Sequence, residues 1–289
     1  MKTNKIHCID VLEGLRKLPS NSIDCVVTSP PYWALRDYKN KNQVGLEEHP
    51  ERYINKIVEI LKECKRVIKP TGSIWINLGD SYYSKSGSEK SNQFLVNHTL
   101  PKNIRGKFKS NWLQHKQRLL IPFRIAIKSQ DELGLILRND ITWLKQWTNF
   151  KTKESGGNSM PCFVNDRLNT NSEAIFFFVK NEKYFFNLDA VRIPYRDKKN
   201  GKNPLGKNPG DCIRFPLEPS REKHSAMFPK SLPEFCILAG CPKNGIVLDP
   251  FMGSGTTAIV AKRLGINFLG FEINKDYIQI AERRINDGN

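Results

Sequence analysis

The stretch Val247-Leu248-Asp249-Pro250-Phe251-Met252-Gly253-Ser254-Gly255-Thr256-Thr257 predicts a strand, then a glycine-containing turn, then the start of a helix. In that geometry the backbone can approach a ligand closely, and N–H groups at the helix start point toward it. The spacing Phe-x-Gly-x-Gly matches neither the dinucleotide fingerprint nor a P-loop, because Gly-Lys-Ser/Thr is missing. The turn therefore favours a compact, uncharged or zwitterionic ligand over a phosphate group.

An acidic residue ends the next apolar strand along the chain. Residues 268–271 are Phe-Leu-Gly-Phe, and Glu272 follows them. An acid about twenty residues after a glycine turn, at the tip of the adjacent strand, is where the hydroxyls of a nucleoside ribose are bound. The two features together favour a nucleoside site, and a plain strand–turn–helix is the alternative.

A second motif, Thr28-Ser29-Pro30-Pro31-Tyr32-Trp33, follows an apolar run that predicts a buried strand. Proline fixes φ and has no N–H, so carbonyl groups in this turn remain available to accept hydrogen bonds. An aromatic residue lies directly behind the two prolines. Such a stiff, partly apolar clamp suits a flat ring that bears an amino group, and an ordinary proline turn at a strand end is the alternative.

Outside these motifs, the chain alternates between strand and helix patterns. Strands are expected at 23–28, 73–78, 135–144, 174–180, 246–249 and 267–272. Helices are expected at 51–68, 119–133, 232–239, 256–264 and 275–285. The strand at 174–180 is expected to form a hairpin with residues 184–187. This alternation predicts an α/β fold, a largely parallel sheet with helices on both faces.

The composition limits the class of protein. The chain has 289 residues, of which 39% are hydrophobic. That size suits one large domain, or one domain with an inserted lobe. No segment approaches the ~20 apolar residues of a membrane span, and no signal peptide is evident, so a cytoplasmic protein without a membrane partner is expected. The seven cysteines are irregularly spaced, which indicates neither a disulfide framework nor a zinc site.

The formal net charge is +17, and its distribution is uneven. Between residues 81 and 128 the basic side chains are Lys85, Lys90, Lys102, Arg105, Lys107, Lys109, Lys116, Arg118, Arg124 and Lys128, against the single acid Glu89. Between 192 and 223 nine basic residues face four acids. Both stretches are rich in loop-forming residues. They indicate a surface that binds a polyanion, with nucleic acid as the leading candidate and a merely solvated surface as the alternative.

Taken together, Thr-Ser-Pro-Pro-Tyr-Trp and Asp-Pro-Phe-x-Gly-Ser-Gly-Thr-Thr resemble the motifs of the amino-group DNA methyltransferases. That family uses S-adenosylmethionine to methylate cytosine N4 or adenine N6. The order here, with the catalytic motif first and the cofactor motif last, is similar to the circularly permuted β group. Segments 120–124, 138–145, 173–181 and 224–238 also look like family segments, so the resemblance covers most of the chain.

The resemblance implies a Rossmann-like S-adenosylmethionine-dependent methyltransferase fold with basic, loop-rich DNA-recognition segments. On that basis the expected parts are a catalytic part (1–80), a basic insertion (81–118), the remainder of the catalytic sheet (119–190), a candidate target-recognition segment (191–223) and a cofactor-binding part (224–289).

The resemblance also assigns cofactor roles residue by residue. Phe251, Gly253 and Gly255 would line the S-adenosylmethionine pocket, with Asp249 at the strand tip and Thr256 opening the helix. Glu272 would bind the ribose hydroxyls. Asp10 would accept a hydrogen bond from the adenine amino group, and a helix N-cap before residues 11–15 is its alternative role. Residues 225–229, with Phe228 among them, would lie under the methionine part.

The catalytic roles implied fall on the Pro-Pro motif. The lone pair of an exocyclic amine is delocalised into its ring, so the amine is a poor nucleophile. Acceptors at both N–H groups draw the nitrogen toward tetrahedral geometry, and Ser29 Oγ and the Pro30 carbonyl are the implied acceptors. Pro31 completes the rigid turn, Tyr32 would stack on the ring, and Trp33 would wall the pocket. The resemblance further implies that the substrate would be double-stranded DNA, from which the base would have to be flipped out.

Alternatives within and outside the family remain at this point. Ser29 favours cytosine N4, because an acid or Asn usually precedes Pro-Pro in adenine-N6 enzymes. A cytosine-C5 mechanism would need a nucleophile such as Cys162 after Pro161, in a stretch with no strand before it. Other classes are a non-catalytic DNA-binding protein and an RNA or protein methyltransferase. A restriction-modification or phage methylase is expected, with a homodimer and a cognate restriction endonuclease as further partners that the resemblance allows.

Overall fold

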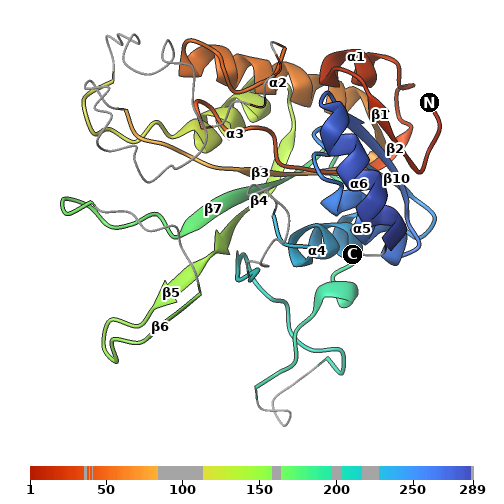
Figure 1. Ribbon diagram of the computed structural model, residues 1–289. Coiled ribbons are helices and arrows are strands. Elements are labelled where there is room, and N and C mark those ends of the chain that lie inside the picture. Colours follow the sequence, from red (N-terminus) through yellow and green to blue (C-terminus); the bar gives the residue numbers. More distant parts are fainter. Residues whose placement is uncertain are drawn as a thin grey trace.

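The computed structural model describes residues 1–35, 38, 40, 42–83, 113–157, 164–196, 203–216 and 228–287. An eight-stranded sheet in the order β1-β10-β9-β2-β3-β7-β4-β8 forms its centre (Figure 1). The strands are β1 (Lys5–Cys8), β2 (Ile23–Thr28), β3 (Ile68–Leu78), β4 (Ile136–Leu144), β7 (Ser172–Val179), β8 (Cys212–Ile213), β9 (Ile246–Asp249) and β10 (Asn267–Glu272). A separate two-stranded sheet pairs β5 (Gln146–Thr148) with β6 (Ser155–Gly157).

The sheet is parallel from β1 through β10, β9 and β2 to β3. β7 then runs antiparallel between β3 and β4, and the short β8 pairs parallel with β4. The largely parallel sheet predicted from the sequence is thus confirmed, with one antiparallel strand inserted.

Helices cover both faces of the sheet. They are α1 (Val11–Arg16), α2 (Pro50–Val67), α3 (Ile121–Asp131), α4 (Ser231–Gly240), α5 (Thr256–Arg263) and α6 (Lys275–Asp287), with a 3-10 helix, η2, at Asp189–Val191. Figure 1 shows α2 and α3 on one side of the strands and α4 and α5 on the other. Each face therefore has its own hydrophobic core.

Successive side chains of a strand point to opposite faces of the sheet, so each strand contributes residues to both cores. In β3, Ile74 and Ile76 pack against α1, α2 and α3, whereas Trp75 packs into the core formed with α4 and α5. Trp75 stacks on Phe177 of β7 with ring centroids 4.1 Å apart. Strands buried on both faces read as continuous apolar runs, and this is why their positions could be predicted.

Most expected elements are confirmed, and three of the expected strands have different bounds. β2, β9 and β10 occupy the predicted residues. β3 starts at Ile68 rather than 73, because the chain passes directly from α2 into the strand and a register shift absorbs the Lys69–Gly72 stretch. An N-terminal strand, β1, and the pair β5–β6 have no counterpart among the expected elements.

The expected hairpin between 174–180 and 184–187 is wrong. Residues 184–187 form no strand; the Phe185 N–H donates to Thr71 O (2.9 Å) and the Asn187 N–H to Ala239 O (2.8 Å). The physical reason is that β7 has both of its edges occupied, one by β3 and the other by β4. No edge is left for a third partner.

Within the described residues, Cys8, Cys25, Cys64, Cys212, Cys236 and Cys241 are free thiols, and no group of three or more His, Cys, Asp or Glu side chains could hold a metal ion. None of the helices in these same ranges is long and apolar enough to cross a membrane. Cys162 and residues 84–112 and 217–227 lie outside the described residues.

Candidate active site

Four neighbouring parallel strands end at the same edge of the sheet. β1, β10, β9 and β2 lie side by side, and their last residues are Cys8, Glu272, Asp249 and Thr28. Ligands of open α/β sheets bind beyond the carboxyl ends of the strands. The two motifs predicted from opposite ends of the sequence therefore meet at one edge.

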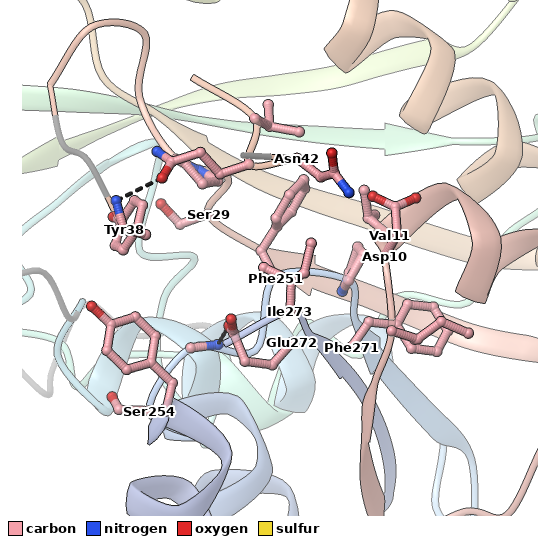
Figure 2. A pocket seen from close by; sticks show the side chains of 17 residues that line it. Asp10, Val11, Ser29, Tyr38, Asn42, Phe251, Ser254, Phe271, Glu272 and Ile273 are labelled. Atoms are coloured by element: carbon pink, nitrogen blue, oxygen red, sulfur yellow. Dashed lines mark hydrogen bonds between the residues drawn. The ribbon is translucent and has the colours of Figure 1, made fainter. Parts of the chain in front are cut away.

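A cavity with about 800 Å³ of empty space, part of it open to solvent, lies at this edge. Its lining is Ile9, Asp10, Val11, Ser29, Pro31, Tyr38, Asn42, Gln43, Val44, Pro250, Phe251, Gly253, Ser254, Phe271, Glu272, Ile273 and Tyr277. In the view of Figure 2, Phe251 lies between Ser29 on one side and Asp10 on the other, with Glu272 below. Among the residues that the structure describes, no lysine or arginine belongs to this lining.

The structure brings six of the predicted site residues to the cavity wall. They are Asp10, Ser29, Pro31, Phe251, Gly253 and Glu272. The wall also contains residues to which the sequence gave no role, among them Tyr38 and Asn42 after the Pro-Pro motif and Tyr277 on α6. The rings of Tyr38 and Tyr277 meet edge to face, with centroids 6.0 Å apart. No motif in the sequence marks these three residues as part of the site.

Glu272 is bonded to the glycine turn beside it. Its Oε2 accepts a hydrogen bond from the Gly253 N–H (2.9 Å), and its Oε1 accepts one from the Asn274 N–H (2.8 Å). Burial raises the pKa of this carboxyl, and these backbone donors oppose the rise. Each oxygen keeps a second lone pair for a ligand donor. The turn and the acid thus form one unit.

Asp10 caps a helix and also lines the cavity. Its Oδ1 accepts hydrogen bonds from the Leu12 N–H (2.9 Å) and the Glu13 N–H (3.2 Å) at the start of α1. The N-cap role left open by the sequence is therefore present. Because one carboxylate oxygen makes both bonds, the cap does not compete with a ligand bond at the other oxygen.

Three of the expected cofactor-binding residues do not line the cavity: Gly255, Asp249 at the tip of β9, and Thr256 at the start of α5. Asp249 is 1% exposed and accepts hydrogen bonds from the Thr28 hydroxyl (2.6 Å), the Thr257 hydroxyl (2.6 Å) and the Phe251 N–H (3.0 Å). It ties the ends of β2 and β9 to the start of α5. Gly255 has φ +86°, and a Cβ there would lie 2.8 Å from Ala281 of α6.

The Pro-Pro motif is held by side chains from the neighbouring strands. Ser29 Oγ donates to Asn77 Oδ1 (3.1 Å). The Tyr32 hydroxyl donates to Glu173 Oε2 (2.7 Å) and lies 2.9 Å from Asn77 Oδ1. Because the Ser29 hydrogen is directed to Asn77, the lone pairs of its oxygen are available to a donor in the cavity.

Glu173 is the centre of this network. It accepts a hydrogen bond from Asn77 Nδ2 (3.1 Å) and forms an ion pair with Lys145 at the end of β4. Burial, with the nearby Glu173 carboxylate as the next cause, raises the pKa of Tyr32 well above its ordinary value, so Tyr32 remains a neutral phenol. Gly79 makes room for its ring, since a Cβ there would lie 2.3 Å from Tyr32.

The sequence reasoning missed Asn77, Glu173 and Lys145. The available signal in the sequence was Asn77, a polar residue inside an apolar strand. In the structure Asn77 is 2% exposed in β3. Buried polar groups are bonded to something, and this one is bonded to the catalytic motif. Pro30, Tyr32, Trp33 and Phe228 do not line the cavity either. The Trp33 indole N–H donates to Glu47 O (2.8 Å), and Phe228 packs against the core formed with α4 and α5.

A family model described as a DNA methylase, N6_N4_Mtase, matches residues 23–283. The chain belongs to this DNA methylase family. Type II methyltransferase M.SmaI of Serratia marcescens is 34% identical over 99% of this chain and 91% of that protein. M.Cfr9I of Citrobacter freundii is 36% identical over 96% of this chain and 85% of that protein. The methylase is thus of the type II, amino-methylating kind.

Solved structures show the same fold. PvuII DNA methyltransferase (cytosine-N4-specific) matches with a TM-score of 0.67 at 21% identity, over 100% of this chain and 92% of that one. The putative DNA modification methylase TTHA0409 of Thermus thermophilus, in complex with S-adenosyl-L-methionine, matches with a TM-score of 0.64 at 22% identity, over 98% and 93%. The expected Rossmann-like methyltransferase fold is confirmed, and one of these neighbours was solved with S-adenosyl-L-methionine bound.

The cavity fits this cofactor. Apolar side chains such as Phe251 and Ile273 can contact a flat base, and the carboxylates of Asp10 and Glu272 can accept from its amino group and ribose hydroxyls. The lack of a lysine or arginine in the described lining disfavours a phosphate and is compatible with a positively charged sulfonium.

The buried carboxyl of Asp249 makes the stability of the methylase pH-dependent. Burial raises its pKa to about 6, against an ordinary 3.8. The folded state therefore binds the Asp249 proton more tightly than the unfolded state does. The stabilisation that this proton binding gives is fully present below pH 4 and is lost as the pH rises through 6. We expect the loss to be ~3 kcal/mol.

Asp249→Asn removes this titration. The free energy of unfolding, measured by urea denaturation from pH 4 to 7, should fall with rising pH in the wild type relative to the variant. A wild-type-minus-variant difference that is constant across this range would contradict the assignment.

Proposed function

We propose that this methylase transfers a methyl group to the N4 amine of a cytosine within a specific DNA sequence. One observation carries the choice of an amine: Ser29 faces the cavity with its hydrogen directed to Asn77, 3.1 Å away. The hydroxyl oxygen is then an acceptor, which an exocyclic N–H can use. Bound S-adenosylmethionine supplies an electrophilic methyl group.

The residues of the motif position the amine. Ser29 Oγ and the Pro30 carbonyl accept from its two N–H groups, which localises the nitrogen lone pair. Tyr32, whose hydroxyl is held by Glu173 and Asn77, is assigned to stack on the base once the base enters the site. The proline turn is fixed from behind, because the Tyr53 hydroxyl donates to Pro31 O (2.9 Å). Such preorganisation avoids reordering the site during the reaction.

Cofactor binding is assigned to the opposite wall of the cavity. Glu272 binds the ribose hydroxyls, Asp10 accepts from the adenine amino group, and Phe251 contacts the ring. Gly253 keeps the turn close enough for Glu272 to reach. Asp249 and Gly255 act indirectly, by holding the strand ends and the packing of α6.

We choose cytosine N4 over adenine N6 because the residue before Pro-Pro is Ser29. The structurally similar PvuII enzyme is described as cytosine-N4-specific, which supports this choice. The substrate base is flipped out of the duplex, at a cost of a few kcal/mol that phosphate contacts recover. Residues 191–223 are proposed to read the sequence; their described part is joined to the sheet through β8, which pairs with β4.

The product nucleoside tests the proposal. The methylase is incubated with unmodified bacterial genomic DNA and S-adenosylmethionine, and the DNA is digested to nucleosides and analysed by mass spectrometry. N4-methylcytosine is expected, and N6-methyladenine would overturn the preference for cytosine. Sequencing the same DNA for modified bases gives the recognition site. We further propose that a cognate restriction endonuclease acts at that site. The methylase itself is proposed to form a homodimer, which gel filtration would test.

A further inference from the structure

The β5–β6 hairpin, residues 146–157, projects from the body of the methylase as an arm (Figure 1). Its strands pair antiparallel, with Gln146 opposite Gly157 and Thr148 opposite Ser155. Hydrogen bonds hold the tip in one conformation: the Asn149 N–H donates to Glu154 O (2.8 Å), and Asn149 Oδ1 accepts from the Lys151 N–H (3.0 Å) and the Thr152 N–H (3.2 Å). The tip is therefore held by its own hydrogen bonds.

The tip presents an aromatic ring with basic neighbours. Phe150 is 85% exposed, and Lys153 Nζ lies over its ring, 3.8 Å from the centroid. Lys151 is exposed beside it, and Trp147, 40% exposed, covers Gly156 at the base of the turn. A single exposed apolar residue is common on protein surfaces. An exposed ring with one ammonium group over it and a second exposed lysine next in sequence, at the end of a projecting arm, matches a surface for stacked bases and phosphates.

The arm begins next to the side-chain network that holds Tyr32. Lys145, the residue before β5, pairs with Glu173, and Glu173 accepts the hydrogen bond of the Tyr32 hydroxyl. Phe150 is five residues further along. At about 3.3 Å per residue in a strand, the tip reaches at most ~16 Å from Lys145, more than the depth of about 8.5 Å of a major groove. The arm thus starts beside the Pro-Pro motif and is long enough to contact a duplex whose target base lies at Ser29.

On the basis of the proposed function, we propose that the hairpin arm contacts the DNA duplex beside the flipped base. Phe150 inserts into the base stack and holds the gap open, and Lys151 and Lys153 bind the flanking phosphates. Apolar side chains that wedge between base steps are a known means of unstacking DNA. The only acid of the arm, Glu154, accepts from the Thr152 hydroxyl (2.9 Å) within the turn.

The wedge is tested with 30-base-pair duplexes that carry the recognition site found by sequencing. In one duplex the target base is paired, and in the other it faces an abasic site. We expect Phe150→Ala to lower kcat/KM about 10- to 100-fold on the paired duplex, since flipping costs a few kcal/mol there. On the abasic duplex the loss should be less than about threefold, because the base is already unpaired. Ile127→Ala, which truncates an exposed apolar side chain on α3, is the matched control.

The phosphate contacts are tested by salt dependence. The slope of log(kcat/KM) against log[NaCl] should become shallower by about 1.8 in Lys151→Gln/Lys153→Gln, at about 0.9 per phosphate contact. Lys62→Gln on α2 should leave the slope unchanged. An unchanged slope in the double variant, or equal losses on both duplexes with Phe150→Ala, would overturn the proposal. Wild-type methylation of genomic DNA is measured first, so failure of the proposed function is recognised separately, and S-adenosylmethionine affinity verifies that each variant is folded.

Discussion

Ser29→Ala is expected to lower kcat about 10²- to 10³-fold, the loss typical when one preorganised hydrogen-bond partner is removed from a reacting centre. The variant loses the oxygen whose lone pairs face the cavity, and Asn77 loses the donor 3.1 Å away. The affinity for S-adenosylmethionine should change little, because Glu272 and Asp10 lie on the opposite wall. Steady-state transfer of a labelled methyl group at saturating DNA and cofactor measures kcat, and equilibrium binding measures the affinity.

The matched control for this variant is Ser22→Ala, directly before β2. Its hydroxyl donates to Pro19 O (2.7 Å), at the opposite end of the same strand from Ser29. We expect wild-type activity from it. If Ser29→Ala retained full kcat, backbone carbonyls alone would suffice to hold the amine, and the hydroxyl would have no catalytic role.

The parts of the fold that could be predicted are those with a local cause. β2, β9 and β10 are apolar runs bounded by turn residues, and their bounds follow from that pattern. The Glu272–Gly253 unit was also accessible, because a turn and the tip of the next strand are adjacent in any parallel sheet. The incorrect hairpin at 184–187 has a non-local cause. One edge of β7 pairs with β3, which lies about a hundred residues earlier in the chain, and no local pattern reveals that pairing.

The catalytic network shows the same limit. Asn77 lies in β3 opposite Ile175 of β7, and Glu173 lies opposite Trp143 of β4. Only the strand order places both beside Tyr32, which comes from the turn after β2. The sequence reveals that Asn77 is a polar residue in an apolar strand, but not which side chain it bonds. The resemblance also implied that Asp249 and Gly255 bind the cofactor, whereas Asp249 is bonded to Thr28 and Thr257 and Gly255 packs against Ala281, so neither lines the cavity.

Glu272→Ala is expected to weaken S-adenosylmethionine binding at least about 100-fold. Two hydrogen bonds from ribose hydroxyls to a carboxylate contribute about 1.5 kcal/mol each, and every 1.4 kcal/mol is a tenfold change in Kd. The variant also removes the acceptors of the Gly253 and Asn274 N–H groups, which loosens the turn. Because the proposed acceptor for the reacting amine is Ser29 and not Glu272, kcat at saturating cofactor should be close to that of the wild type. Glu282→Ala, at an exposed site on α6, is the control.

Loss of affinity alone would not separate ribose binding from support of the turn, so the assignment needs a ligand change as well. S-adenosylhomocysteine and its 2′-deoxy analogue, measured by calorimetry, provide it. If Glu272 binds the 2′-hydroxyl, the analogue should bind the wild type about tenfold or more weakly and bind Glu272→Ala about as well as the parent compound, because a pair that interacts is not additive. The alternative result is that the 2′-deoxy analogue binds both proteins more weakly than the parent compound by the same factor. The Glu272 carboxylate would then only hold the Gly253 turn, and another acceptor in the cavity would bind the ribose, with the Asp10 carboxylate as the candidate.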